Sequence, residues 1–267
     1  MSVAGGGRWG DLPARVLSGI AMLLIGGAAV WLGGGAFAAL VVPVVGLMMW
    51  ELARMTAGVA RDLALPLGVF AAACLAVILL FQPPLLWPRA AVLLLPVLAG
   101  VLMPRRDRAV HAGYALLIML TGYGLITLRA EGGVALILWL ILLVVVSDIM
   151  GYFAGRILGG PKFWPRISPK KTWSGTVAGW LGAVVVGAAF AGLGQGGWWL
   201  LWLSPLVAFA GQLGDIAESW IKRRAGVKDS SALIPGHGGV LDRFDALVFA
   251  VVLAFALSLL IAVPVGG

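Results

Sequence analysis

The sequence has few charged residues and almost no cysteine or histidine. Only 11% of its 267 residues are Asp, Glu, Lys or Arg, against about 25% in typical soluble domains. The single cysteine, Cys74, lies in an apolar run, so we expect it in a helix core or facing lipid, and it can form no disulfide within the chain. With one cysteine and two histidines, the chain also lacks the Cys and His spacings of a structural zinc site.

Apolar residues make up most of the chain. They account for 61% of it, and the mean hydropathy is +1.05, which excludes a water-soluble globule. We therefore expect an all-α, polytopic integral membrane protein that forms a single domain over residues 1–267. Apolar runs long enough to cross a bilayer predict nine membrane helices. These runs cover residues 16–33, 36–53, 63–81, 85–103, 110–128, 133–157, 173–194, 198–221 and 244–263.

The positive charges fall on one set of loops. The chain carries 19 Lys and Arg against 11 Asp and Glu, a net charge of +8. Because the basic residues lie between apolar runs and form no continuous stripe, we expect no nucleic acid partner. The N-terminal segment and alternate loops together hold every basic residue except Arg89 and Arg129. The positive-inside rule assigns those loops to the cytoplasm, which predicts a cytoplasmic N-terminus and a C-terminus outside.

The N-terminal half is chemically quiet. Glu51 and Arg54 lie three residues apart at the end of one apolar run, a spacing that favours a local ion pair on a helix. His111 begins another run beside a cluster of arginines, so we expect it at the membrane interface and not in a binding site. We therefore assign this half mainly a scaffolding role and place the active site within residues 147–245.

Polar residues become regular at the end of the sixth apolar run. Asp148, Tyr152 and Arg156 recur every four residues, so they share one face of a helix. Asp148 fits two interpretations equally well: an ion pair with Arg156 or with a lysine of a neighbouring helix, or contact with a metal or nucleotide. A second face carries small residues that favour close helix packing, namely Gly151, Gly155 and Gly159.

The loop that follows combines lysines with hydroxyl groups. Ser168 and Pro169 favour a turn, and Thr172 is suited to cap the next helix. Lys170 and Lys171 lie just before that helix begins, where a helix N-terminus and two ammonium groups would suit a phosphate. The alternative is a cytoplasmic anchor that follows the positive-inside rule.

A stripe of polar residues begins in the eighth apolar run. Asp215, Glu218, Ser219 and Lys222 fall at positions i, i+3, i+4 and i+7 of a helix. Asp242 and Asp245 share a face at the start of the ninth helix. Carboxylates on two adjacent helix ends provide the hard oxygen ligands that magnesium prefers. The alternative is an ion-pair network with the basic residues Lys222, Arg223, Lys228 and Arg243.

The loop between these two helices is rich in glycine. Gly236, Gly238 and Gly239 surround His237 and permit backbone N–H groups to approach an anion closely. His237 is suited to contact a phosphate or to orient a ligand. A purely structural turn is the alternative.

Together these residues closely resemble the signature of the phosphatidate cytidylyltransferases, the bacterial CDP-diacylglycerol synthases. The matching positions are Asp148, Gly151-Tyr152, Ser168-Pro169-Lys170-Lys171-Thr172, Ser219-x-x-Lys222-Arg223, Lys228-Asp229 and Pro235-x-His237-Gly238-Gly239-x-x-Asp242-Arg243-x-Asp245. They lie in about the C-terminal half of the chain. Ser174 departs from the family pattern, in which many members have an acidic residue, so no essential carboxylate is expected there.

The resemblance implies a nucleotidyltransferase that moves CMP from CTP to phosphatidate and releases pyrophosphate, for phospholipid biosynthesis. It also implies magnesium with room for a second cation, a homodimer, and a location in the inner membrane with the active site facing the cytoplasm. Carried over by position, Asp215 and Asp242 resemble the principal metal ligands, and Ser219 lies in the same site.

The candidate site residues fall into three groups. The catalytic group is Asp215, Ser219, Lys222, Asp242 and Asp245. The group that binds substrate phosphates is Ser168, Lys170, Lys171, Thr172, Arg223, Lys228, His237, Gly238, Gly239 and Arg243. The metal group is Asp215 and Asp242, with Asp148, Glu218 and Asp245 as further candidates. Two other functions stay open: a CTP-dependent lipid or polyprenol kinase, and an ion-coupled secondary transporter, because intramembrane carboxylates also mark transport routes.

Overall fold

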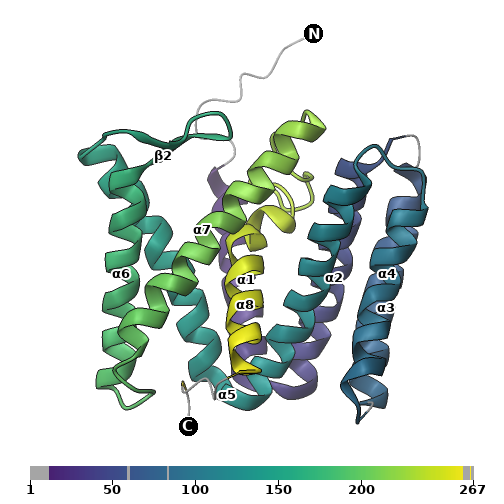
Figure 1. Cartoon of the computed structure of the whole chain (residues 1–267), viewed down its shortest axis with the longest axis horizontal. Coiled ribbons are helices and arrows are strands. Elements are labelled where there is room, and N and C mark those ends of the chain that lie inside the picture. The colour runs from purple at the N-terminus through teal and green to yellow at the C-terminus, as the bar shows by residue number, and fades with distance from the viewer. Residues whose placement is uncertain (1–11, 59–60, 83, 261–264, 266–267) are drawn as a thin grey trace.

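The computed structural model describes residues 12–58, 61–82, 84–260 and 265 as a helix bundle (Figure 1). Its α-helices are α1 (Leu12–Leu32), α2 (Gly34–Thr56), α3 (Ala64–Phe81), α4 (Leu86–Leu102), α5 (Arg108–Ile157), α6 (Trp173–Gly192), α7 (Leu200–Ala225) and α8 (Leu241–Ser258). A 3-10 turn, η1 (Arg61–Leu63), precedes α3. The predicted all-α membrane architecture is therefore confirmed.

The prediction of nine membrane spans is wrong. Within the described ranges, six helical segments are long and apolar enough to cross a membrane, and α4 is a shorter apolar helix, which supports six to seven spans. The predicted spans 110–128 and 133–157 correspond to the two arms of α5, whose helical geometry is interrupted at Gly133, where φ is 64°. The predicted span 244–263 corresponds to α8, which begins with three charged residues in its first five.

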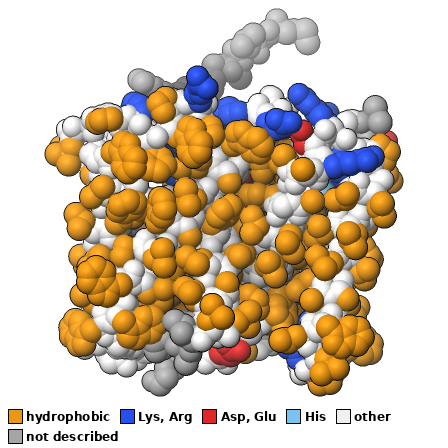
Figure 2. Space-filling model, in the orientation of Figure 1, with side chains coloured by type: hydrophobic (Ala, Val, Ile, Leu, Met, Phe, Trp, Pro, Cys, Tyr) orange, Lys and Arg blue, Asp and Glu red, His pale blue; other side chains and the backbone are white. Residues whose placement is uncertain are grey.

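The bundle has two unlike ends. Figure 1 shows that one end carries the start of α1, the β-strands and the loop between α7 and α8, while the bend of α5 lies at the other. In Figure 2, most visible Lys and Arg side chains gather at the first end, and hydrophobic side chains cover the wall between the two ends. This charge distribution agrees with the predicted grouping of basic loops on one side. The two chain termini themselves lie outside the described residues.

A small β-hairpin follows α5 at the charged end. Strand β1 (Lys162–Trp164) pairs antiparallel with β2 (Ser168–Thr172), with Lys162 opposite Thr172. The sequence predicted only a turn at Ser168 and did not predict this hairpin. The predicted cap is confirmed, because Thr172 Oγ1 accepts a hydrogen bond from the Gly175 N–H at 3.2 Å and so begins α6.

Helices α5 and α6 pack closely through glycine. A Cβ atom on Gly155 would lie 2.7 Å from Thr172 Oγ1, and one on Gly151 would lie 3.2 Å from the Gly175 carbonyl oxygen. The expected packing face is thus confirmed for these two glycines. Gly159 lies beyond the end of α5, with φ of 63°, so it belongs to the following turn.

The core contains polar side chains that hold helices together. Trp139 is fully buried, and its Nε1 donates to Ser204 Oγ at 3.0 Å. His111 is also fully buried, with Nδ1 3.1 Å from Thr56 Oγ1, so the prediction of an interfacial His111 is wrong. The reason is that the start of α5 packs against α2 and α4. Cys74 is buried, as expected.

Helix α1 is joined to the bundle mainly at its two ends. At the charged end, Ser18 Oγ donates to the Pro235 carbonyl oxygen at 3.0 Å. At the other end, Arg129 of α5 donates to the carbonyl oxygens of Val30 at 2.8 Å and Trp31 at 3.2 Å. Only Ala29 and Val30 of this helix are buried, so most of its surface is left for lipid.

Candidate active site

A cavity of about 700 Å³ opens at the charged end, between α5, β2, α6, α7 and α8. Its wall combines carboxylates with cations and hydroxyls. The polar and charged lining residues are Ser147, Asp148, Tyr152, Arg156, Lys170, Lys171, Thr172, Thr176, Gln212, Asp215, Asp242, Arg243 and Asp245. This volume lies within the range of small-molecule sites.

Strand β2 brings a lysine against the acidic stripe of α7. Lys171 Nζ forms an ion pair with Asp215 Oδ2 at 2.5 Å and donates to the Gln212 carbonyl oxygen at 3.3 Å. The other carboxylate oxygen of Asp215, Oδ1, accepts from Ser219 Oγ at 3.3 Å. The hairpin therefore carries the predicted lysine loop onto the predicted carboxylate helix, across 44 residues of sequence.

Gln212 connects three helices below this ion pair. Its Nε2 donates to Ser147 Oγ at 3.0 Å and to the Thr176 carbonyl oxygen at 3.3 Å, and its Oε1 accepts from Trp180 Nε1 at 3.1 Å. Gln212 was not among the predicted site residues. An amide within an apolar helix was the available signal, since such a group must find partners inside the bundle.

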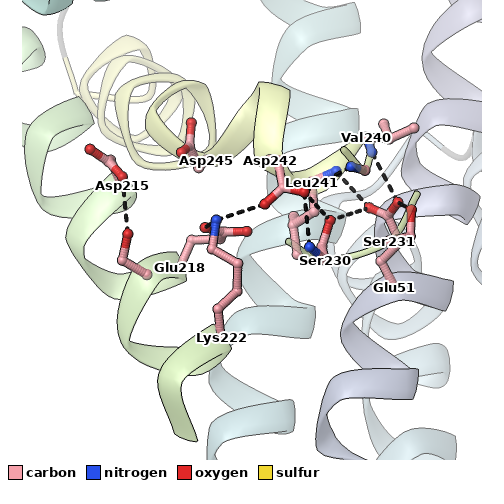
Figure 3. Close-up of polar contacts among 12 residues, drawn as sticks. Glu51, Asp215, Glu218, Lys222, Ser230, Ser231, Val240, Leu241, Asp242 and Asp245 are labelled. Carbon is pink, nitrogen blue, oxygen red and sulfur yellow. Dashed lines mark hydrogen bonds and ion pairs between the residues drawn. The ribbon is translucent and has the colours of Figure 1, made fainter. Parts of the chain in front are cut away.

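A second ion-paired group lies where α7 meets α8. Lys222 Nζ forms ion pairs with Glu218 and with Asp242 Oδ1, the latter at 2.6 Å (Figure 3). Asp242 Oδ2 accepts three further hydrogen bonds: from Ser230 N–H at 2.9 Å, Ser230 Oγ at 2.8 Å and Gly239 N–H at 2.8 Å. Asp242 thus holds the loop between the two helices as well as lining the cavity.

Glu51 of α2 reaches the same loop from the N-terminal half. Its Oε1 accepts from Ser231 Oγ at 2.5 Å and Val240 N–H at 2.9 Å, and its Oε2 accepts from Leu241 N–H at 2.6 Å and Ser230 Oγ at 3.2 Å. These amides belong to the N-terminus of α8, so a carboxylate from another helix caps it. We call Glu51, Ser230, Ser231 and Asp242, with the amides of 239–241, the anchor cluster (Figure 3).

The predicted ion pair between Glu51 and Arg54 is wrong. Arg54 lies over the ring of Trp50, with Cζ 4.9 Å from the ring centroid, while Glu51 is fully buried and faces the anchor cluster. Residues three apart on a helix need not share a partner when one of them faces the core. A buried acidic residue in an apolar helix was the signal for a distant partner.

The glycines of the α7–α8 loop make room for the anchor cluster. Gly238 has φ of 84°, and a Cβ atom there would lie 2.9 Å from Asp242 Oδ2. A Cβ atom on Gly239 would overlap Ser230 Oγ and Glu51 Oε1. Glycine thus permits the expected close approach of backbone to an anion, and in this structure the anions are two carboxylates of the protein itself.

The structure distributes the candidate residues over three places. Asp148, Lys170, Lys171, Thr172, Asp215, Asp242, Arg243 and Asp245 line the cavity together. A second group contacts these aspartates. Ser219 contacts Asp215, Lys222 contacts Asp242, and Glu218 is ion-paired with Lys222. The remaining candidates are not among the cavity-lining residues within the described part of the chain: Ser168, Arg223, Lys228, His237, Gly238 and Gly239. His237 Nδ1 lies 2.8 Å from Ser18 Oγ of α1.

The cavity carboxylates do not form a complete metal cage. Among residues whose positions are described, no three Asp, Glu, His or Cys side chains come close enough to hold an ion by themselves. Asp148, Asp215, Asp242 and Asp245 nevertheless line one cavity from three helices. This donor set fits magnesium, which commonly takes one or two carboxylates and completes its coordination with water and substrate phosphates.

Comparisons with known proteins agree with these features. A model of the cytidylyltransferase family matches residues 13–261. The phosphatidate cytidylyltransferase of Brucella abortus (strain 2308) is 48% identical over 134 residues, 49% of this chain and 50% of the relative. Those of Helicobacter pylori and Staphylococcus aureus (strain COL) are 40% identical over 149 residues (54% and 55%) and 42% identical over 124 residues (45% and 47%). The chain thus spans about half the length of the curated relatives it matches.

Proposed function

Because this chain belongs to the cytidylyltransferase family, we propose that it transfers CMP from CTP to phosphatidate and so forms CDP-diacylglycerol and pyrophosphate. The observation that carries the proposal is the cavity at the charged end of an apolar bundle. Its wall places Lys171 and Asp215 together beside three further carboxylates. A water-soluble triphosphate and a lipid phosphate could meet there without either leaving its own phase.

The reaction needs no dedicated base. An oxygen of the phosphatidate phosphate, already ionised near neutral pH, attacks the α-phosphorus of CTP. The new P–O bond joins the two phosphates, while the bond from the α-phosphorus to the bridging oxygen breaks and its electrons leave with pyrophosphate. The contribution of the protein is alignment of the two phosphates and stabilisation of the developing charge.

The cations of the cavity fit this task. Lys171 is fixed by Asp215, and Lys170 and Arg243 line the same wall without any ion pair among the described residues. We assign these three to the phosphates of the two substrates. Lys222 is ion-paired with Glu218 and Asp242, so its positive charge lies beside the Asp242 carboxylate.

Magnesium completes the proposal. We assign Asp215 and Asp242 as its principal ligands, with Asp148 and Asp245 on the same cavity wall as further ones. When bound, the ion would neutralise charge on the triphosphate and on the departing pyrophosphate. Asp245 Oδ1 accepts from its neighbouring Ala246 N–H at 2.7 Å, which orients that carboxylate.

We further propose that the charged end faces the cytoplasm of a bacterial inner membrane. The support is the collection of Lys and Arg at that end (Figure 2), where CTP would be available. A cytoplasmic N-terminus follows from this orientation, since α1 begins there. On the basis of the family resemblance, we also propose that the protein forms a homodimer.

A labelling experiment tests the reaction. The purified protein in detergent would receive phosphatidate, magnesium and CTP labelled at either the α- or the γ-phosphate. We expect label in the lipid product only from α-labelled CTP, and loss of that product with a chelator. Label from γ-labelled CTP would instead indicate a lipid kinase, and no lipid label under conditions where a known relative is active would refute transfer.

A further inference from the structure

One strip of α5 lines the cavity along most of its depth. Val144 and Val145 lie at its inner end, Asp148 follows one turn later, and Tyr152 and Arg156 lie toward the charged end. Because these residues recur about every four positions, they form a single face of the helix. The wall therefore changes from apolar to charged along the direction that crosses the membrane.

Arg156 is held in place without a carboxylate partner. Its Nη1 donates to Tyr152 Oη at 2.8 Å, and it forms no ion pair within the described ranges. Asp148, which shares its face, forms none either, so the ion pair considered for these two residues is not present. The positive charge of Arg156 thus lines the cavity without neutralisation by a neighbouring acid.

The same turns of α5 also border lipid. Phe153 is 55% exposed and Ile157 77% exposed, and both follow directly after a residue of the cavity strip. On a bundle with an apolar wall, exposed side chains of this kind contact acyl chains. Tyr152 itself is largely exposed. The edge of α5 therefore separates the cavity from the bilayer by the width of one helix.

We propose that this strip is the binding site for the lipid substrate, with Arg156 and Tyr152 binding its phosphate monoester. A guanidinium forms two parallel hydrogen bonds to a phosphate, and a tyrosine hydroxyl beside it can donate a third. The acyl chains would leave along Val144 and Val145 toward the exposed apolar face. This inference rests on the proposed function and divides its cavity: the lipid phosphate lies on α5, and the nucleotide lies toward Lys171 and Asp215.

Substitution of Arg156 tests this division. For Arg156→Gln we expect the KM for phosphatidate in mixed micelles to rise about 10-fold or more, which is the effect of losing a charge-assisted pair of hydrogen bonds. The KM for CTP should change by less than about 2-fold, because the nucleotide contacts remain. Arg156→Lys should restore part of the loss. The matched control is Arg166→Gln, which removes an exposed arginine of the hairpin that does not line the cavity.

A binding measurement separates this inference from the proposed function. Retention of labelled phosphatidate by the detergent-solubilised protein, without CTP, should exceed that of phosphatidylcholine and should fall in Arg156→Gln and, less, in Tyr152→Phe. An unchanged KM for phosphatidate in Arg156→Gln, or an equal rise in the KM for CTP, would overturn the lipid site while wild-type transfer still stood. Thermal unfolding of each variant checks that it is folded. If the wild-type protein bound phosphatidate through Arg156 but formed no CDP-diacylglycerol, the proposed reaction would be refuted and the proposed lipid site would stand.

Discussion

The anchor cluster and the cavity wall use the same residue types at the same end of the bundle, for different purposes. In the anchor cluster, Glu51 and Asp242 each accept hydrogen bonds from two backbone amides, and the Ser230 hydroxyl lies between the two carboxylates. On the cavity wall, Asp215 has one ion pair and one long hydrogen bond. Its side chain is 28% exposed, against 3% for Asp242. Glu51, which is fully buried and lies outside the cavity lining, serves to fix the loop, whereas the more exposed Asp215 keeps capacity for a ligand.

Asp242 belongs to both regions. Through Oδ2 it holds Ser230 and Gly239, and through Oδ1 it meets Lys222 at the cavity. Because the Ser230 hydroxyl lies 3.2 Å from Glu51 Oε2 and 2.8 Å from Asp242 Oδ2, it links helix α2 to the cavity. The quiet half of the chain therefore supports the site directly.

The largest expected effect is on the cavity side. Asp215→Asn should lower CMP transfer by about 100-fold or more, since removal of one preorganised charge-stabilising group typically costs that much. The matched control is Asp107→Asn. Asp107 is also ion-paired with a basic side chain, that of Arg224 at 2.6 Å, and the hydrogen bond from Arg224 lowers the pKa of Asp107. The transfer rate should fall in Asp215→Asn and not in Asp107→Asn, and the thermal unfolding temperature of each variant shows whether it is folded. Near-normal turnover of Asp215→Asn would remove this residue from the chemistry.

The next largest effect is on the stability of the anchor cluster. Glu51→Ala would leave two amides of α8 and the Ser231 hydroxyl without their acceptor, at a cost of about 3 kcal/mol or more in unfolding free energy. Hydrogen exchange of the loop over residues 229–241 should accelerate. Glu131→Ala, at an exposed position, is the control and should leave both measurements unchanged. Equal stability of the two variants would contradict the assigned role of Glu51.

A smaller effect is expected from added volume. Gly239→Ala would place a methyl group against Ser230 and Glu51, and overpacking of this kind costs about 1–3 kcal/mol. Gly113→Ala adds the same methyl group where no atom lies within 4 Å, so it should be neutral or slightly stabilising. Thermal unfolding in detergent compares them. If Gly239→Ala unfolded at the wild-type temperature but lost CTP affinity, the glycine would serve the nucleotide and not the anchor cluster.

The smallest effect concerns His237. Because its ring nitrogen contacts Ser18 of α1, His237→Ala should lower stability by about 1 kcal/mol and leave the KM for CTP unchanged. Ser18→Ala should give a similar loss, and the double variant should lose little more, because both single changes break the same contact. A rise in the KM for CTP in His237→Ala alone would return this residue to the phosphate-binding group.

Local patterns in the sequence were sufficient for the helices and for half of the cavity. Periodicity placed Asp215 and Ser219 on one face, and the structure joins them by a hydrogen bond. The Thr172 cap is also a local property. By contrast, Glu51 and Gln212 were missed, because their partners lie on other helices and a single sequence gives no direct information on which helices are neighbours.

The number of spans was overestimated for a related reason. Hydropathy identifies apolar runs, but it does not give the length of the helix that each run forms, and α4 is shorter than the six candidate spans of the described residues. It also assigned a span to residues 244–263, although the helix there, α8, begins with Leu241 and Asp242, which are held by Glu51 and Lys222. Charges satisfied by protein partners are tolerated at positions where lipid would exclude them.

The attachments of α1 set an order of events in synthesis. This helix precedes the other described helices in the chain, yet its contacts at the two ends are with residues far behind it: Arg129 follows Val30 by 99 positions, and Pro235 follows Ser18 by 217. During translation, the hydrogen bonds that join α1 to α5 and to the α7–α8 loop can therefore form only after those segments emerge. The first described helix is thus among the last to complete its polar contacts, and its apolar, largely lipid-facing surface is compatible with the bilayer until then.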